Sequence, residues 1–512
     1  MPRSPPSPSE DTPAVDCGEA ARRWTLVAAI LGSGMAFVDG TIVNVALPAI
    51  QHAMQATTAG AQWVMESYAL LLSALLLVGG VLGDRFGRRR VFASGALVFT
   101  VSSLGCAAAP GIGWLILARG LQGLGAALLV PGSLSLITSA YPKERRGRAI
   151  GTWSAFSGVT AAIGPVLGGF LVEHLSWHWA FLINVPLGLA LIVICRWQVP
   201  ESRGAVAGGI DVAGALLATL GLSGVVYALI EAPQQGWLSP GVGIAAAVGV
   251  SASIAFVVAE RRIAAPMLPL GLFRDRNFAG ANLLTLLLYA ALGGSLFFVP
   301  LNLIQVQGYG ATGAGASLLP FIVIMFVLSR WTGQLVDRVG ARLPLVVGPA
   351  IAAGGFALYA VPGVGGSYWT TFFPAAAVLG LGMSITIAPL TTTVMNALEP
   401  GLAGTASGVN NAVSRVAGLI AIAAFGVVLT QGFDARLQTG LHGLSLPHEV
   451  VQAIVDQKAR LAGIELPRGA EAAKAVVDRA FVAGFRRVML LSAALALLSS
   501  LVAGFTIRDP QR

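Results

Sequence analysis

The sequence has few charged residues and few cysteines for its length. Only 11% of its 512 residues are Asp, Glu, Lys or Arg, whereas soluble domains carry about 25%. The three cysteines, Cys17, Cys106 and Cys195, are far apart, so neither a disulfide framework nor a zinc site is expected. No P-loop, catalytic-serine elbow or zinc-protease motif is present. The sequence therefore predicts no enzyme of these classes and no resident metal or cofactor.

Hydrophobic residues and glycine are what the sequence has in excess. The residues Ala, Val, Ile, Leu, Met, Phe, Trp, Tyr and Cys make up 55% of the chain, and 64 residues are glycine. A mean hydropathy of +0.78 over this length is incompatible with a soluble or disordered chain and indicates lipid as the main solvent. A helix needs about 20 apolar residues to span a bilayer. Fourteen segments qualify: 24–50, 61–82, 91–109, 113–138, 149–172, 180–196, 210–231, 241–259, 278–304, 313–336, 343–361, 369–394, 404–430 and 486–507.

The basic residues predict how these helices are oriented. Of 32 Lys and Arg residues, 21 lie in the N-terminal tail and in the alternate connections on its side. The six short connections on the other side contain none, so the positive-inside rule places both termini in the cytoplasm. Residues 431–485 form a longer outer connection with six acidic and six basic residues. The net charge of +9 thus reports orientation and not a nucleic-acid partner, and the excess of Arg over Lys favours a bacterial cytoplasmic membrane.

An internal repeat divides the chain. The pattern Gly-x-Leu-x-Asp-Arg-x-Gly-x-Arg begins at Gly80 and recurs at Gly333, an offset of 253, and Gly-Thr-x-Ser recurs at the same offset. The repeat predicts two parallel six-helix halves. We therefore expect an all-α polytopic membrane protein in four parts: a disordered tail at 1–20, a first half at 21–200, two inserted helices at 201–276, and a second half at 277–512.

Several motifs, in order along the chain, resemble those of the major facilitator superfamily, and of its fourteen-helix drug:proton antiporter branch in particular. They are the loop at 80–90, the first-helix motif at 39–48, the arginine motif at 119–125, the Gly-Pro-Gly-Gly motif at 158–169 and Asn184-Val-Pro at the sixth helix. The resemblance implies a transporter that works by alternating access of two halves. The sequence departs from the pattern at His178, which usually is Arg, and at Glu66, where a small polar residue is expected.

Charged residues inside the apolar segments are functional candidates, because each is costly to place in lipid. Asp39, Arg119 and Glu66 fall at similar heights when depth is counted at 1.5 Å per residue. We predict proton coupling through Asp39, with Arg119 as its partner or relay and Glu66 as a second proton site or a cation anchor. The alternatives are a static Asp39–Arg119 pair and a Glu66 that faces interfacial water.

Two further groups of residues are predicted from the motifs. The glycines permit close helix packing at the interface of the halves, and Pro165 bends its helix. In the loop at 80–90, Asp84 can accept hydrogen bonds from a neighbouring helix N-terminus, and the arginines can pair with it. Ordinary packing and a plain basic loop are the alternatives. The predicted gating residues are Gly80, Asp84, Arg85, Gly87, Arg88, Gly164, Pro165, Gly168, Gly169, Asp337 and Arg338. The predicted substrate-cavity residues are Asn44, Gln122, Asn410, Asn411 and Arg415, and a structural role for Arg415 is the alternative.

The resemblance implies proton-coupled antiport that exports lipophilic drugs or antibiotics. One proton moving down about 100 mV supplies about 2.3 kcal/mol, enough for roughly a 50-fold gradient of a neutral substrate. No ATP site is needed, and the expected partners are the bilayer, protons and a small molecule. No motif supports a periplasmic adaptor. Two alternatives remain: a dedicated exporter of one metabolite or self-made antibiotic, and a non-transport membrane receptor.

Overall fold

The computed structural model describes residues 18–204, 211–263, 266–398, 403–444, 446–467 and 470–509. Within these ranges the side chains of residues 143–144, 155, 158, 161–162, 329–330, 333–338 and 403–404 are not described. The predicted tail at 1–20 lies outside the described residues apart from Gly18, Glu19 and Ala20, of which Glu19 and Ala20 already belong to the first helix. Long apolar segments without polar–apolar alternation fold as helices, because intrahelical hydrogen bonds satisfy every backbone polar group in lipid.

The first half contains seven helices: α1 (Glu19–Ala53), α2 (Thr58–Phe86), α3 (Arg88–Ala107), α4 (Ile112–Ala140), α5 (Lys143–His174), α6 (Trp179–Leu182) and α7 (Asn184–Trp197). Two inserted helices and a short turn follow: α8 (Val212–Gln235), α9 (Pro240–Glu260) and η1 (Leu270–Arg274). The second half contains α10 (Arg276–Leu301), η2 (Asn302–Val306), α11 (Ala311–Ala316), α12 (Leu319–Val339), α13 (Arg342–Tyr359), α14 (Tyr368–Asn396), α15 (Ala403–His442), α16 (His448–Asp456), η4 (Lys458–Gly463) and α17 (Glu471–Thr506).

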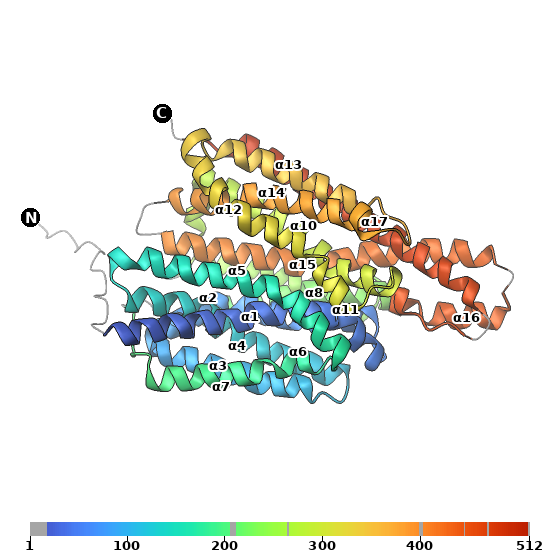
Figure 1. Cartoon of the computed structure of the whole chain (residues 1–512), viewed down its shortest axis with the longest axis horizontal. Coiled ribbons are helices and arrows are strands. Elements are labelled where there is room, and N and C mark those ends of the chain that lie inside the picture. The colour runs from blue at the N-terminus through green and yellow to red at the C-terminus, as the bar shows by residue number, and fades with distance from the viewer. Residues whose placement is uncertain are drawn as a thin grey trace, which may run out of the picture.

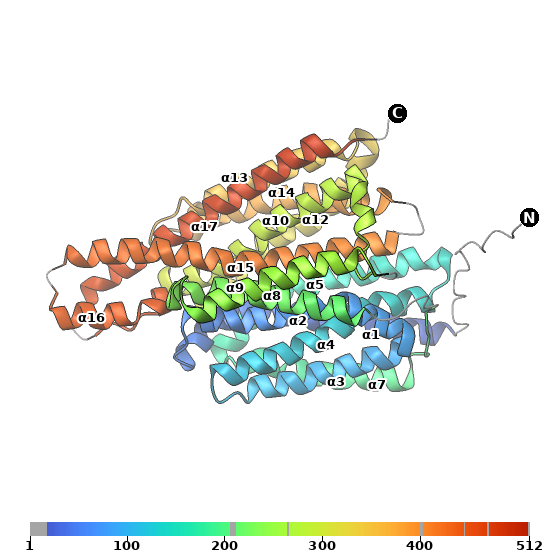
Figure 2. The same ribbon diagram turned by 180° about the vertical axis from the view of Figure 1, so that it is seen from behind.

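The predicted all-α membrane architecture is confirmed. Each of the fourteen predicted segments is helical, with α6–α7, α10–η2 and α11–α12 each covering one segment. Thirteen helices among the described residues are long and apolar enough to cross a membrane, and α5 supplies the remaining predicted segment. The two halves lie side by side, and α8 packs against both α2 and α15 (Figures 1 and 2).

Glycine explains how closely the helices pack. A methyl group on Gly123 of α4 would lie 2.3 Å from the backbone oxygen of Tyr68 on α2, and one on Gly125 would lie 2.6 Å from the amide nitrogen of Phe99 on α3. Any larger residue would push these backbones apart. Association without a hydrophobic driving force depends on such close approach, so the glycine excess of the sequence serves helix packing.

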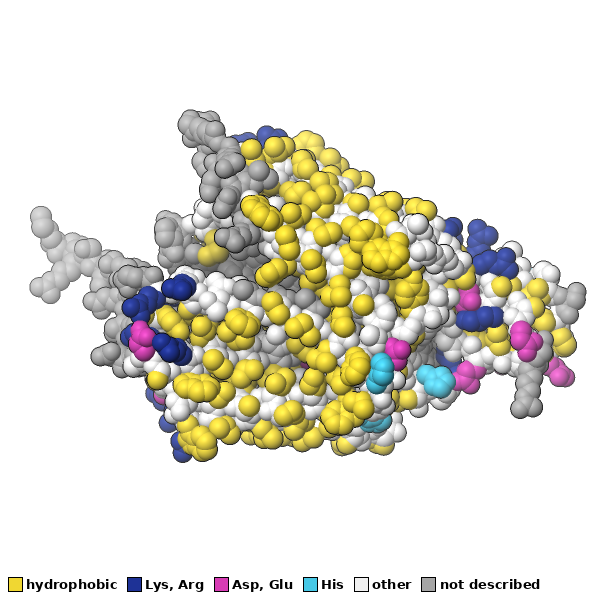
Figure 3. Space-filling model, in the orientation of Figure 1, with side chains coloured by type: hydrophobic (Ala, Val, Ile, Leu, Met, Phe, Trp, Pro, Cys, Tyr) yellow, Lys and Arg dark blue, Asp and Glu magenta, His cyan; other side chains and the backbone are white. Residues whose placement is uncertain are grey.

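The two ends of the bundle differ. Both termini of the described chain lie at one end, here called the terminal end, which is on the left in Figure 1. Figure 3 shows basic side chains gathered there, mixed charges at the opposite end, and a broad hydrophobic surface between them. This distribution suits a chain that crosses a bilayer along its long axis.

The segment 431–485 is largely helical, although the sequence suggested a long connection. Helix α15 continues to His442 and α17 begins at Glu471, so both project beyond the other helices and carry α16 between them (Figure 1). Buried apolar residues one turn apart, such as Phe433, Leu437 and Leu441, hold the projection together. We call this segment the helical cap and its end of the molecule the cap end.

The halves are joined at the cap end and diverge toward the terminal end (Figures 1 and 2). Hydrogen bonds between the halves gather near the cap: Asn44 donates to the oxygen of Leu296, Gln62 to that of Ile422, and Gln305 to Gln51. The structure therefore shows a conformation that is closed at the cap end.

Candidate functional site

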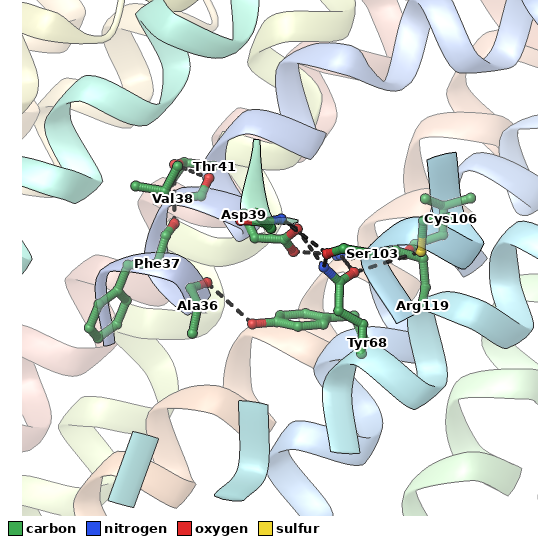
Figure 4. Close-up of polar contacts among 12 residues, drawn as sticks. Ala36, Phe37, Val38, Asp39, Thr41, Tyr68, Ser103, Cys106 and Arg119 are labelled. Carbon is green, nitrogen blue, oxygen red and sulfur yellow. Dashed lines mark hydrogen bonds and ion pairs between the residues drawn. The ribbon is translucent and has the colours of Figure 1, made fainter. Parts of the chain in front are cut away.

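Asp39 is the centre of a buried polar network in the first half. Its helix, α1, is apolar around it, and its side chain is fully buried. Three side chains on two other helices donate hydrogen bonds to its carboxylate: Arg119 to Oδ2 at 2.5 Å, Gln122 to Oδ1 at 2.8 Å and Asn184 to Oδ1 at 2.9 Å. Figure 4 shows Asp39 directed toward Arg119 and Ser103. An ionised carboxylate is stable at this depth only because these donors compensate its lost hydration.

Arg119 connects this network to a third helix. Its side chain is also fully buried on α4, and its Nε donates to the backbone oxygen of Val64 on α2 at 3.0 Å. Its guanidinium carbon lies 4.3 Å from the ring centre of Tyr68, a cation–π contact. The predicted partnership of Asp39 and Arg119 is thus a buried ion pair. Removing one member of such a pair strands the other charge, at a cost of about 3–5 kcal/mol.

Ser103 and Asn184 are functional candidates that were not among the predicted site residues, although Asn184 begins one of the motifs. Ser103 on α3 accepts hydrogen bonds from Gln122 at 2.7 Å and Asn184 at 3.2 Å. Both are fully buried. With Asp39 and Arg119 they link α1, α3, α4 and α7, so a change of charge at the carboxylate reaches four helices. Asn184 belongs to a motif of the sequence, whereas nothing in the sequence distinguishes Ser103 from the other two serines of α3.

Glu66 is buried on α2 rather than exposed at the interface. Neither of its carboxyl oxygens has a hydrogen-bond partner in the described part of the structure. It therefore does not join the network around Asp39. Its role as a second proton site or a cation anchor stays a prediction.

The predicted substrate-cavity residues fall into separate places. Asn44 donates to Leu296 across the halves, and Gln122 belongs to the Asp39 network. Asn410 donates to Asn282 and Thr285 within the second half. Asn411 is exposed and Arg415 half-buried on the next turn of α15. The structure brings Arg415 close enough to the Tyr68 hydroxyl for an electrostatic interaction, so it lies at the boundary of the two halves.

Helix α5 packs closely on both halves through the predicted glycines. Methyl groups on Gly164 and Gly168 would collide with Thr41 and Ile42 of α1, and one on Gly169 would lie 2.4 Å from the oxygen of Ala311. From the other side, a methyl on Gly315 of α11 would collide with the oxygen of Pro165. Near this contact, the carboxylate of Glu173 accepts a hydrogen bond from the backbone N–H of Thr312 at 2.8 Å. We call these α5–α11 contacts the cap-end seam.

The loop after α2 is held by a residue that sequence reasoning missed. Asp84 accepts a hydrogen bond from Arg88 at 2.7 Å, as its motif suggests. Glu201, however, is the residue that accepts from the N-terminus of α3, at the N–H of Arg89, and it pairs with Arg89 and Arg90. Gly87 has a φ of 111°, which side chains rarely adopt. Gly80 lies on α2 next to Pro131, and Arg85 faces out near Phe86.

The second half repeats this arrangement with different residues. Asp509, after α17, accepts hydrogen bonds from the N–H groups of Ala341 and Arg342 at the start of α13. Gly340 has a φ of 80°. Thus the last helix of each half brings an acid to the third helix of the same half. Asp337 and Arg338 belong to α12, but their side chains lie outside the described residues.

An apolar cavity of about 510 Å³ lies where the halves and the inserted helices meet. Its walls come from α2, α8, α9, α10 and α15, and include Leu222, Phe256 and Val413. Among its lining residues, Val257, Leu283 and Leu286 are exposed. Sites for small ligands typically measure about 300–1,000 Å³ and are mostly apolar, so the cavity is large enough for a lipophilic molecule.

Comparison with known proteins agrees with this architecture. The profile of the Major Facilitator Superfamily matches residues 29–422. The multidrug resistance protein Stp of Mycobacterium tuberculosis is 34% identical over 92% of this chain and 89% of its own length. The tetracenomycin C resistance and export protein of Streptomyces glaucescens is 33% identical over 98% of this chain and 94% of its own.

A solved structure shares the fold. A bacterial homologue of the human lysosomal transporter Spinster, in an inward-facing and unoccupied conformation, superposes with a TM-score of 0.67. It is 16% identical and covers 97% of this chain and 100% of its own. The predicted resemblance is confirmed: this chain belongs to the major facilitator superfamily and is a multi-pass membrane transport protein, not an enzyme.

Proposed function

We propose that this protein is a proton-coupled antiporter that exports lipophilic small molecules from the cytoplasm, with its terminal end on the cytoplasmic side. The observation that carries the proposal is the fully buried Asp39–Arg119 pair, held by amides from two further positions. The names of the relatives support export of drugs or antibiotics. The basic terminal end supports the orientation, and under it the closed cap end corresponds to an inward-facing state.

The coupling step follows from the charge on Asp39. While ionised, it attracts Arg119 and accepts from Gln122 and Asn184. A proton removes the negative charge, so the attraction to Arg119 is lost and Arg119 is left as an uncompensated buried cation. The network is then more stable in another arrangement of α1, α3, α4 and α7.

Helix α1 transmits this change to the seam. Between Asp39 and Asn44 it carries Thr41 and Ile42, against which Gly164 and Gly168 of α5 pack. Asn44 itself reaches across to Leu296 of the second half. A shift of α1 therefore acts both on the direct contact between the halves and on α5, whose Gly169 touches α11.

The test is transport by purified protein in liposomes under an imposed pH gradient. We expect lipophilic antibiotics to accumulate on the acidic side, and the accumulation to collapse when a protonophore dissipates the gradient. A panel of substrates separates broad drug efflux from dedicated export of one metabolite. Transport that ignores both the pH gradient and the protonophore would refute proton coupling, and no movement of any panel compound would refute export of lipophilic molecules.

A further inference from the structure

Two acidic side chains meet at the terminal end of the inserted helices. Asp211 precedes α8 and its Oδ1 accepts a hydrogen bond from the N–H of Gly214 at 2.7 Å, as the N-cap of that helix. Glu260 is the last residue of α9, and its Oε2 accepts from the N–H of Leu268 at 2.8 Å. Each carboxyl group thus satisfies one backbone N–H with one oxygen.

The second carboxyl oxygens of Asp211 and Glu260 both lie close to Gly214. Asp211 Oδ2 and Glu260 Oε1 are both buried and have no hydrogen-bond partner among the described residues. A methyl group on Gly214 would lie 2.4 Å from the first and 2.8 Å from the second. The two oxygens are therefore within about 5 Å of each other, the sum of these distances. Glu260 as a whole is only 3% exposed.

The described residues around this pair do not supply a cation for it. The groups that interact with Glu260 in the described structure are Asp211 and the N–H of Leu268. Arg261 and Arg262 follow on the chain but are exposed. Two ionised carboxylates with bare oxygens at this separation repel each other strongly once they are removed from water. One proton between them removes the repulsion and gives each oxygen a partner.

We propose that Asp211 and Glu260 bind one proton between Oδ2 and Oε1, and that this proton fixes the linker after α9 to the start of α8. The proton comes from water at the terminal end. One carboxyl then donates its O–H to the other carboxylate, so the pair carries a single negative charge. That this water is cytoplasmic rests on the proposed orientation, whereas the proton site itself does not depend on Asp39.

Through the linker after α9, the shared proton affects the wall of the apolar cavity. Met267, Leu268 and Phe273 contribute to the wall of the 510 Å³ apolar cavity. Leu268 is held by the same glutamate that shares the proton. When the pair loses its proton, the two carboxylates repel each other and the hold on the Leu268 N–H is weakened. The pair is therefore a proton-controlled latch on one wall of the cavity.

Infrared difference spectroscopy on the full-length protein in lipid tests the site. We expect a protonated-carboxyl band that disappears as pH is raised and is absent in both Asp211→Asn and Glu260→Gln. Asparagine still caps a helix, so Asp211→Asn keeps α8 intact. The matched control is Asp275→Asn, since Asp275 caps α10 through the N–H of Phe278; this variant should retain the band. A band unchanged in both pair variants would overturn the proposal.

Hydrogen exchange at the Leu268 amide provides a second readout. Glutamine at 260 imitates the protonated acid, since it can donate to Asp211 and still accept from Leu268. We expect wild type to lose protection relative to Glu260→Gln as pH rises, and Glu260→Ala to lack protection throughout. Parallel exchange in wild type and Glu260→Gln at every pH would contradict a shared proton. If added NaCl or CaCl2 shifts the infrared band or the exchange profile, the two carboxylates bind a metal cation instead of a proton, and the proposal is equally overturned. Neither readout requires transport, so the outcome is independent of the proposed antiport.

Discussion

The cap-end seam offers a prediction whose size can be worked from the structure. Substituting Gly169 with alanine places a methyl carbon 2.4 Å from the backbone oxygen of Ala311 and 2.6 Å from Cα of Thr312. Backbone atoms cannot move aside as a flexible side chain would, so α5 and α11 must separate by about 1 Å to reach ordinary contact. Overpacking of this kind costs about 1–3 kcal/mol. The cost applies only while the cap end is closed, and it therefore shifts the conformational equilibrium about 5- to 150-fold toward states open there.

Pulsed electron spin resonance measures this shift directly. Spin labels at Leu175 and Val364, which are 56% and 48% exposed in loops of the two halves, report the width of the cap end in a variant without native cysteines. Gly169→Ala should gain a longer-distance population. Gly151→Ala, on the same helix as Gly169, is the matched control, because a methyl group at Gly151 has no neighbouring atom within 4 Å. If Gly169→Ala and Gly151→Ala give the same distances as the parent, the seam does not hold the halves together.

Three further substitutions probe the other contacts. Asn184→Ala removes one donor to Asp39 and should destabilise the closed state by about 1–3 kcal/mol; pH-driven transport that equals wild type would argue against its part in the network. Glu201→Ala removes the acceptor at the start of α3 and should cost about 1 kcal/mol, seen as a lower thermal midpoint that Glu201→Gln largely restores. Hydrogen bonding from Thr312 lowers the pKa of Glu173, so the contact should persist at neutral pH and be lost only as pH falls through that lowered value. The same spin labels should show this acid-induced opening in wild type and lose it in Glu173→Gln; an unchanged pH response would contradict the assignment.

The helices were predictable because lipid imposes one solution on a long apolar segment. The partnership of Asp39 and Arg119 was also predictable, since so few charges lie in the spans and their depths follow from the helical rise. The apolar stripe of the helical cap was harder to recognise, because charged residues interrupt it and the segment reads as a connection. The structure shows that Phe433, Leu437 and Leu441 share one buried face of α15 in the cap.

Polar partners contributed by distant helices were beyond the reach of sequence reasoning. Ser103 is one of many small polar residues in apolar helices, and its place beside Gln122 depends on how α3 and α4 cross. Glu201 and Asp509 lie far along the chain from the helix ends that they cap. The loop motif suggested that Asp84 would perform this task, and the fold assigns it to Glu201.

The most direct test of the account is proton movement coupled to substrate, measured in liposomes for wild type, Asp39→Asn and the control Glu449→Gln, which removes an exposed carboxyl in α16 of the helical cap. Wild type and Glu449→Gln should move protons against the exported substrate. Asp39→Asn should lose proton movement and pH-driven accumulation, yet still exchange labelled for unlabelled substrate, which demonstrates a folded transporter. Undiminished substrate-dependent proton movement in Asp39→Asn would contradict the central claim that the buried Asp39–Arg119 pair couples the proton to transport.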